Sequence, residues 1–184
     1  AQRDEEERYD LALFERAGEL GLTGLPYPEA YGGAGMGTFA WVLAAEEIAA
    51  ADMALAVSLS VHVLSQLCIY ANGTDEQKQR FLPPICRGQV RSWQLLTEPG
   101  AGSDLAGIKT TATRDGDDWI LNGVKTWCTV AGRAEYLLVL ARTDPDRDKG
   151  HRGLSLFVVD KDKHEGHEFV AEQDGDGQAG PRIW

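Results

Sequence analysis

The sequence predicts two domains of different class, an all-α helical domain over residues 1–90 and an all-β barrel or sandwich domain over residues 91–184. Two observations support this prediction. Apolar residues recur three or four apart before residue 90, whereas β-branched and aromatic residues gather in short runs from Arg91 onward. Helices followed by strands favour separate α and β domains over alternating βαβ units.

The 184 residues have an ordinary globular composition, with 43% hydrophobic and 26% charged residues. The 29 acidic and 18 basic residues give a net charge of −11 without any Lys/Arg run, which argues against a nucleic-acid partner. The 3 cysteines form no CxxC pair and the 4 histidines lack ligand spacing, so we expect no metal site and a reducing compartment. The chain begins at Ala1 without a leader pattern, and a cytoplasmic protein is therefore expected.

The first helix is expected over residues 4–20. Its apolar stripe is formed by Leu11, Phe14, Ala17 and Leu20. A Gly/Pro-rich connection follows over residues 21–37, and Thr38 is expected to cap a second helix that ends near Ala51.

Residues 53–71 contain no charged side chain, which leaves two interpretations. The length allows a membrane span. However, Ser58, His62 and Gln66 would lie near mid-span, where polar side chains are unfavourable in lipid. We therefore favour a central helix buried in a bundle, with no membrane span.

A short charged helix is expected next. Thr74 and Gln77 have the spacing of a capping box at its start. Pro83 and Pro84 are expected to end it, because proline lacks the amide hydrogen that a helix interior needs.

Turn dipeptides divide the second half of the chain into strands. Asp115-Gly116 separates residues 108–113 from residues 119–121, and Asn122-Gly123 follows, so both dipeptides are read as hairpin turns in a meander of strands. Further strands are expected at residues 136–142 and 154–159, with turn chemistry in the DPDRD segment between them.

The segment TEPGAGSD at residues 97–104 is the clearest ligand-binding candidate. Gly100 and Gly102 allow backbone amides to approach a ligand, while Thr97 and Ser103 add hydroxyl groups. The spacing does not match the dinucleotide-binding fingerprint. A simple glycine-rich turn is the alternative.

A second candidate lies at residues 125–129. In a strand, Trp127 and Thr129 would point to the same side and present an aromatic plane and a hydroxyl to one ligand. The alternative is a half-buried tryptophan of the core.

Four short motifs together resemble the acyl-CoA dehydrogenase family. They are EAYGG at residues 29–33, GTDEQKQ at residues 73–79, TEPGAGSD at residues 97–104 and NGVKTW at residues 122–127. The last two motifs are highly specific at this separation. The resemblance implies a helical domain and a middle β domain, completed by a C-terminal helical domain, with FAD bound between the domains.

The resemblance also implies roles for individual residues. Thr97 would hydrogen-bond the pyrimidine edge of the flavin, Trp127 would cover the flavin face, and Thr129 would donate toward N5. Ser103 would lie beside the pantetheine part of the acyl-CoA. The full set of implied cofactor-binding residues is Gln94, Leu95, Leu96, Thr97, Ser103, Trp127, Cys128 and Thr129. The late part of the uncharged helix would help to wall the acyl pocket, and whether His62 reaches that pocket stays open.

The implied reaction is α,β-dehydrogenation of an acyl-CoA thioester, followed by reoxidation of FAD by an electron-transfer flavoprotein. The family's base is a Glu of the C-terminal domain, so no catalytic residue is assigned in this chain, and Glu98 is expected to be a structural carboxylate. The resemblance implies a homo-oligomer, either tetramer or dimer. We expect this chain to be the first half of a longer enzyme. Two alternatives stay open: a non-catalytic flavin- or CoA-binding homologue, and an acyl-CoA oxidase or flavin monooxygenase of the same fold.

Overall fold

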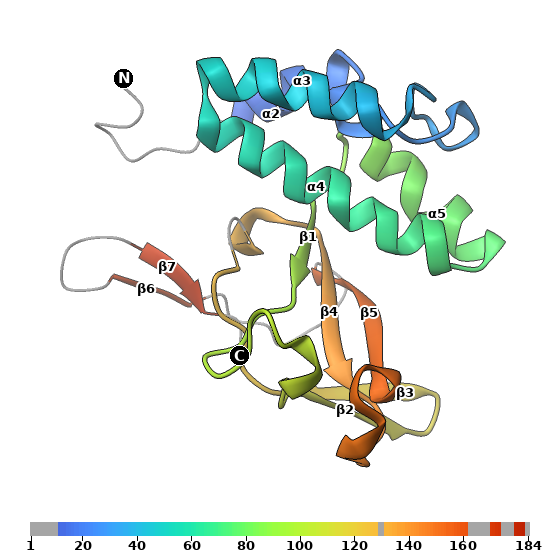
Figure 1. The fold of residues 1–184 in the computed structure, drawn as a ribbon, viewed down its shortest axis with the longest axis vertical. Helices are drawn as coiled ribbons and strands as arrows, with labels where there is room; N and C mark the ends of the chain where they lie inside the picture. The colour runs from blue at the N-terminus through green and yellow to red at the C-terminus, as the bar shows by residue number, and fades with distance from the viewer. Residues whose placement is uncertain (1–10, 129–130, 162–169, 174–178, 183–184) are drawn as a thin grey trace. The chain divides into compact units, whose positions relative to one another are not determined.

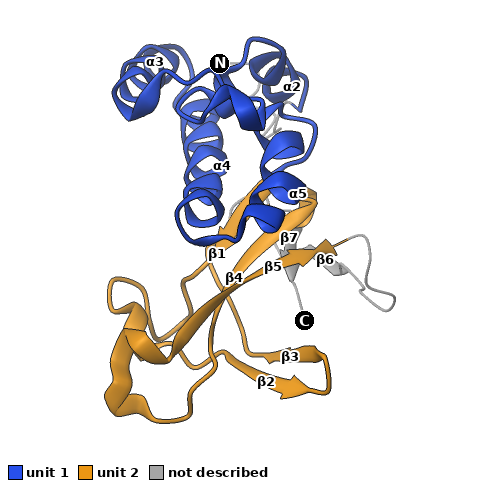
Figure 2. Ribbon diagram, turned by 90° about the vertical axis from the view of Figure 1, so that its right-hand side faces the viewer, with its two compact units in different colours: residues 1–91 blue, residues 92–184 orange. Residues whose placement is uncertain are grey.

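The computed structural model describes residues 11–128, 131–161, 170–173 and 179–182 (Figure 1). The chain divides into two compact units, Ala1–Arg91 and Ser92–Trp184 (Figure 2). The first is helical and the second contains the strands, which confirms the predicted fold class.

The helical unit contains four described α-helices and two short 3-10 turns. In chain order they are α2 (Leu11–Glu19), η1 (Leu22–Gly24), η2 (Glu29–Tyr31), α3 (Gly37–Ala51), α4 (Met53–Asn72) and α5 (Asp75–Cys86). Phe14 and Ala17 of α2 are buried as predicted, whereas Leu20 is 61% exposed. Leu20 leaves the apolar stripe because α2 ends at Glu19 and the chain turns at Gly21, whose φ is 75°.

The predicted cap of α3 at Thr38 is wrong. The backbone of Met36 is already in the helical region, and no side chain caps this helix. Thr38 therefore lies inside the first turn, where its hydroxyl does not take the capping position. At the next helix, the side chain of Asp52 accepts a hydrogen bond from the amide of Leu55 and caps α4.

One face of α4 forms the centre of the helical unit. Within the described residues, α4 is the helix whose length and apolar composition would allow a membrane crossing. Its mid-helix polar side chains nevertheless have protein partners: Gln66 Nε2 donates to the carbonyl of Thr23 at 2.7 Å, and Cys86 Sγ donates to Gln66 Oε1 at 2.9 Å. These bonds favour the bundle-helix interpretation.

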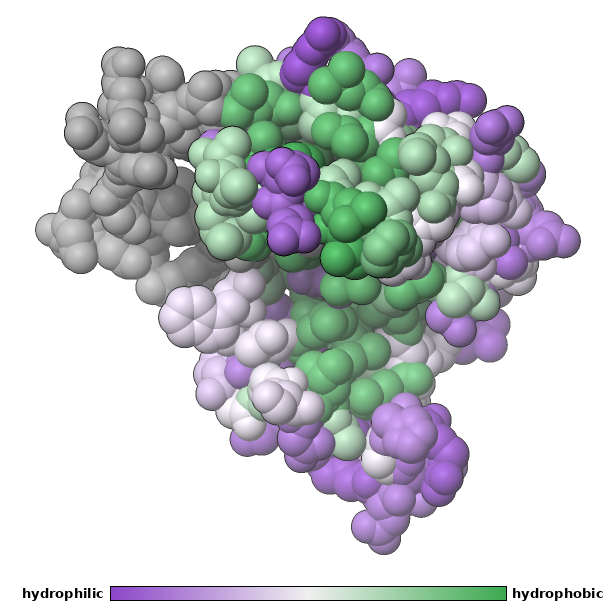
Figure 3. Space-filling model, turned by 45° about the horizontal axis from the view of Figure 1, so that its top comes forward, coloured by the Kyte–Doolittle hydropathy of each residue, from purple (hydrophilic) through white to green (hydrophobic). Residues whose placement is uncertain are grey.

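The burial of α4 is one-sided, with one face packed inside the helical unit and the other exposed. Leu64 and Leu67 are exposed on α4, as are Phe39, Val42 and Leu43 on α3. Figure 3 shows apolar patches on the visible surface of the helical unit.

The capping box at the start of α5 is confirmed, since Thr74 and Gln77 exchange both expected hydrogen bonds. The predicted end at Pro83 and Pro84 is wrong, because α5 continues through both prolines to Cys86. Leu82, Ile85 and Cys86 are fully buried, and this packing holds the last turn although the prolines donate no hydrogen bonds.

The second unit contains a five-stranded mixed sheet and a separate two-stranded ribbon. The sheet is formed by β1 (Ser92–Leu95), β2 (Thr111–Asp115), β3 (Asp118–Asn122), β4 (Tyr136–Arg142) and β5 (Leu154–Asp160). The ribbon is formed by β6 (Val170–Gln173) and β7 (Ala179–Arg182). Short 3-10 turns lie at η3 (Leu105–Gly107), η4 (Ala131–Arg133) and η5 (Arg147–Gly153).

The sheet is not the meander that the turn signals predicted. β4 lies at its centre and pairs in parallel with β1 and with the start of β2, while β5 runs antiparallel along the full length of β4. The β2–β3 hairpin at Asp115-Gly116 is confirmed. Gly116 has a φ of 61°, the left-handed conformation that such a turn requires.

Candidate functional site

The TEPGAGSD segment forms a tight turn directly after β1. The amide of Glu98 donates to the carbonyl of Ala101 at 2.8 Å, and the amide of Ala101 donates back at 3.1 Å. Gly100, Gly102 and Ser103 are exposed beyond this pair of bonds. The turn therefore presents backbone and one hydroxyl to solvent while its Glu98 end is buried.

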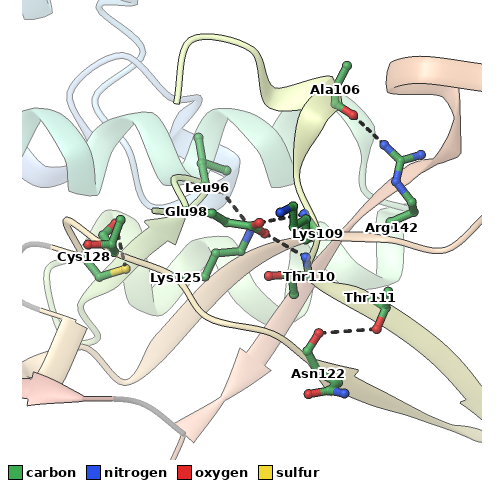
Figure 4. Close-up of polar contacts among 11 residues, drawn as sticks. Leu96, Glu98, Ala106, Lys109, Thr110, Thr111, Asn122, Lys125, Cys128 and Arg142 are labelled. Atoms are coloured by element: carbon green, nitrogen blue, oxygen red, sulfur yellow. Dashed lines mark hydrogen bonds and ion pairs between the residues drawn. The ribbon is translucent and has the colours of Figure 1, made fainter. Parts of the chain in front are cut away.

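The carboxylate of Glu98 holds the turn to two other segments, which contain residues 109–110 and Lys125 (Figure 4). Its oxygens accept hydrogen bonds from the amide of Lys109 at 2.6 Å and the amide of Thr110 at 2.9 Å. Lys125 Nζ donates to the same carboxylate at 2.9 Å. Glu98 is only 7% exposed, so these bonds replace its hydration.

Burial by itself raises the pKa of Glu98, but the hydrogen bonds from Thr110, Lys109 and Lys125 outweigh it and hold the pKa at about 2. Glu98 is therefore ionised at neutral pH, with its oxygens already engaged by donors. A carboxylate in this state is a poor general base. Its surroundings make it a structural group.

Lys125 brings the second motif to the first. Besides the bond to Glu98, Lys125 Nζ donates to the carbonyl of Leu96 at 3.0 Å. The amide of Thr126 donates to the carbonyl of Thr97, also at 3.0 Å. The segments TEPGAGSD and NGVKTW, distant in sequence, are thus joined side by side, and we call this set of bonds the Glu98–Lys125 clamp.

The Asn122-Gly123 dipeptide does not make the predicted second hairpin turn, because residues 123–128 contain no strand. Gly123 is required for another reason. A Cβ atom at this position would lie 2.3 Å from Thr110 Oγ1 and 2.6 Å from Thr110 Cα. The chain crosses Thr110 too closely for any side chain.

Trp127 is neither in a strand nor in the core. Its indole is 86% exposed, and its φ of 57° is left-handed, which is unusual for a bulky residue. Strained backbone of this kind gathers at functional sites. Thr129 lies outside the described residues, so its predicted place beside Trp127 stays a prediction.

The remaining predicted cofactor-binding residues fall into two groups. Leu95 is buried, so only its backbone could meet a ligand, whereas Gln94, Leu96, Thr97 and Cys128 are half-buried. Cys128 Sγ lies 3.5 Å from the carbonyl of Thr126, and burial raises the pKa of this thiol against the opposing effect of Lys125. His62 is fully buried in the helical unit, with Nε2 3.1 Å from the carbonyl of Ile85.

Sequence reasoning gave no role to the side chains of two residues that shape this region. Lys125 is the lysine of the NGVKTW motif, but its partner Glu98 lies 27 residues earlier in the sequence, so no local pattern indicates the pair. Arg142 ends the apolar run YLLVLAR, and its guanidinium is buried. The feature of the sequence that could have indicated a role for Arg142 is a charged residue at the end of an apolar strand.

The exposed Trp127 and the half-buried Thr97, held on two clamped segments, offer an aromatic plane and a hydroxyl that suit a flat heteroaromatic ligand such as a flavin. The described residues contain no cluster of three or more His, Cys, Asp or Glu side chains that could hold a metal ion.

Comparison with known proteins matches both units to domains of one family. Residues 1–89 match the family model described as acyl-CoA dehydrogenase, N-terminal domain, and residues 94–181 match the model described as acyl-CoA dehydrogenase, middle domain. The acryloyl-CoA reductase (NADH) of Anaerotignum propionicum is 39% identical over 86% of this chain and 40% of its own length. A short-chain specific acyl-CoA dehydrogenase of Clostridium acetobutylicum is 37% identical over 88% of this chain and 42% of its own length.

The solved structures agree. Butyryl-CoA dehydrogenase from Megasphaera elsdenii aligns with a TM-score of 0.84 and 34% identity, covering 99% of this chain and 48% of that one. This chain therefore spans less than half the length of the relatives it matches. Both of its units match one family along nearly their whole length, and the chain belongs to the acyl-CoA dehydrogenase family.

Proposed function

We propose that this chain supplies the flavin site and part of the acyl-CoA site of an FAD-dependent acyl-CoA dehydrogenase. The observation that supports this most is the Glu98–Lys125 clamp, which joins the turn bearing Thr97 to the segment bearing Trp127. The reaction is α,β-dehydrogenation of an acyl-CoA thioester.

In this proposal the clamped segments form one wall of the flavin pocket. The Thr97 hydroxyl hydrogen-bonds the pyrimidine edge of the ring, and the backbone of Gln94, Leu95 and Leu96 lines it. Trp127 covers the ring face and excludes water, while Cys128 and Thr129 continue the same segment toward N5. FAD supplies the hydride acceptor when it is bound.

The turn at Gly100 and Gly102 receives the pantetheine part of the substrate, with Ser103 as a hydrogen-bonding partner. Exposed glycines allow backbone amides to approach the ligand closely. This mode of capture suits a chain with a net charge of −11, which does not attract a polyanionic ligand by overall charge.

The proton at the α carbon needs a base outside the described residues of this site. Glu98 does not serve, because its pKa of about 2 and its three donors leave it little affinity for a proton. We place the base in a part of the protein that corresponds to the portion of the relatives not spanned here.

The proposed electron acceptor is an electron-transfer flavoprotein, and the proposed assembly is a homo-oligomer. A chain solved in a study of the electron transferring flavoprotein of Acidaminococcus fermentans aligns with a TM-score of 0.86 and 36% identity. Cys68, Cys86 and Cys128 are not disulfide-bonded, which is compatible with the cytoplasmic location that we propose.

A second candidate function is an oxidase of the same fold. A prolyl acyl carrier protein oxidase aligns with a TM-score of 0.82 and 30% identity. An oxidase would pass electrons to oxygen and would not need a flavoprotein acceptor.

One experiment separates these candidates. The purified protein that contains this chain is denatured to release and identify its cofactor, and the native protein is mixed with short acyl-CoA thioesters and an artificial acceptor dye. We expect FAD and substrate-dependent dye reduction, with little oxygen uptake when the dye is absent. Rapid oxygen uptake without dye would favour the oxidase. A protein that neither contains nor binds FAD would contradict the proposed function.

A further inference from the structure

Arg142 is a buried cation at the end of the central strand β4. Its side chain is 4% exposed, and no carboxylate forms an ion pair with it among the residues that the structure describes. Its Nε atom is buried without a hydrogen-bond partner. This arrangement calls for an explanation, because a buried arginine normally has a paired anion.

The guanidinium instead binds backbone carbonyls of two turns. Nη2 donates to the carbonyl of Ala106 in η3 at 2.6 Å (Figure 4). Nη1 lies 3.5 Å from the carbonyl of Gly150 in η5. The backbone amide of Arg142 donates to the carbonyl of Thr110 at 2.8 Å. Arg142 thus links the strand, the two turns and the segment that donates to Glu98.

Room for this side chain is kept by a glycine. A Cβ atom at Gly153 would lie 2.9 Å from Nη1 of Arg142, too close without displacement of the guanidinium. The two turns η3 and η5 also pack against each other. The fold is therefore shaped around the guanidinium at this place.

The turn that Arg142 holds continues directly from the ligand loop. Ala106 lies three residues after Ser103. The amide of Gly107 donates to the carbonyl of Asp104 at 3.1 Å, and this hydrogen bond forms the turn that contains Ala106. Asp144 is close enough for the Arg142 charge to help lower its pKa, but no carboxylate hydrogen-bonds the guanidinium among the described residues. An apolar side chain of similar size commonly stabilises a fold as well as a buried charge without such a direct partner, or better. Unfavourable groups of this kind persist mainly where function requires them.

We propose that Arg142 is a positioning residue for the acyl-CoA loop: it holds η3 in place and so fixes Ser103 and the backbone of Gly100 to Gly102 in the conformation that receives the pantetheine chain. The inference rests on the proposed function of that loop. It predicts a selective defect, because Arg142 bonds Ala106, two residues after the TEPGAGSD segment ends, whereas Lys125 bonds Leu96 and Glu98 at its start.

The test measures coenzyme A and FAD binding separately in the full protein. The variants are R142M, which removes both the charge and the donors, and R142K, which keeps the charge and a donor that can reach toward the Ala106 carbonyl. G153A is a second way to displace the guanidinium without removing it. T143V is the control: Thr143 Oγ1 bonds Ser155 Oγ at 2.8 Å and the carbonyl of Gly153 at 3.4 Å, so the variant perturbs the η5 side of Arg142 while leaving the bond from Arg142 to Ala106 in place.

We expect R142M and G153A to weaken coenzyme A binding roughly tenfold, as loss of a preorganised loop does, with FAD affinity changed less than about twofold. R142K should recover part of the lost affinity, and T143V should keep it. Amide hydrogen exchange of Gly107 should become faster in R142M but not in T143V.

Equal coenzyme A affinity in the wild type and in the folded variants would overturn the inference while leaving the proposed function intact. If R142M does not fold, G153A carries the same comparison. Failure of the wild-type protein to bind either FAD or coenzyme A would instead contradict the proposed function, and this inference with it.

Discussion

The carboxylate of Glu98 and the ammonium of Lys125 lie 2.9 Å apart, and both side chains are almost wholly buried. The pair connects the turn after β1 with the irregular segment that carries Trp127. Since the Lys125 ammonium also reaches the carbonyl of Leu96, loss of either partner leaves uncompensated polar groups in the interior.

Substitution of Lys125 by Met tests the energetic weight of this pair. K125M removes the cation while keeping an apolar stem, and we expect a loss of about 3–5 kcal/mol in the free energy of unfolding, measured by urea denaturation. K149M is the matched control, because Lys149 pairs with Asp144 at an exposed site. Its stability should change little. Equal, small effects of the two substitutions would contradict the structural role of Lys125.

Glu98 should make the stability of the protein depend on pH in the acid range. Its pKa falls from a usual value of 4.5 to about 2 on folding, so the unfolded chain takes up the proton first as pH decreases. The stabilisation is therefore complete above pH 4.5 and is lost as pH falls toward 2. The shift corresponds to about 3 kcal/mol.

The measurement is the free energy of unfolding from pH 6 down to about pH 2 for the wild type and for E98Q. Glutamine cannot titrate, so E98Q should be less stable at pH 6 and should lose about 3 kcal/mol less over this interval. Parallel pH profiles for the two proteins would show that Glu98 keeps an ordinary pKa in the folded state.

Gly123 should be intolerant of any side chain. The Cβ of G123A would meet Thr110 at 2.3 Å, and the resulting shift would disturb the amide that donates to Glu98. We expect a loss of roughly 1–3 kcal/mol in a thermal or urea unfolding experiment. At Gly100 a Cβ atom would meet nothing within 4 Å, so G100A is the control and should fold with near wild-type stability.

The left-handed backbone conformation of Trp127 should cost the folded protein some stability. Glycine adopts a φ of 57° without steric cost, and the exposed indole contributes little packing to the fold. We therefore expect W127G to have an unfolding midpoint at or above that of the wild type while its flavin affinity falls. A marked loss of stability would show that the indole is needed for the fold itself.

Local signals predicted the elements well where neighbouring residues decide the structure. The Thr74 and Gln77 capping box and the Asp115-Gly116 turn each depend on residues within four positions, and both are present. Pro83 and Pro84 misled the prediction because the burial of Ile85 and Cys86 outweighs the missing amide hydrogens.

The candidate site was predictable only in part. The resemblance selected the two motifs, but composition and turn dipeptides did not reveal how they meet. Lys125 reaches Glu98 across 27 residues, and Arg142 reaches Ala106 across 36. Asn122-Gly123 has the form of a hairpin turn, yet its glycine is required by the close crossing over Thr110, a contact between segments that are separate in sequence.

We propose that the clamped segments hold a flavin beneath Trp127. The FAD stoichiometry and dissociation constant of W127A, measured in the full protein, test this placement. W119A is the control, because Trp119 is another partly exposed tryptophan of the same unit that packs on Phe157. We expect W127A to lose most of its bound FAD and W119A to retain it. Unchanged FAD binding in W127A would contradict the placement of the flavin at this site.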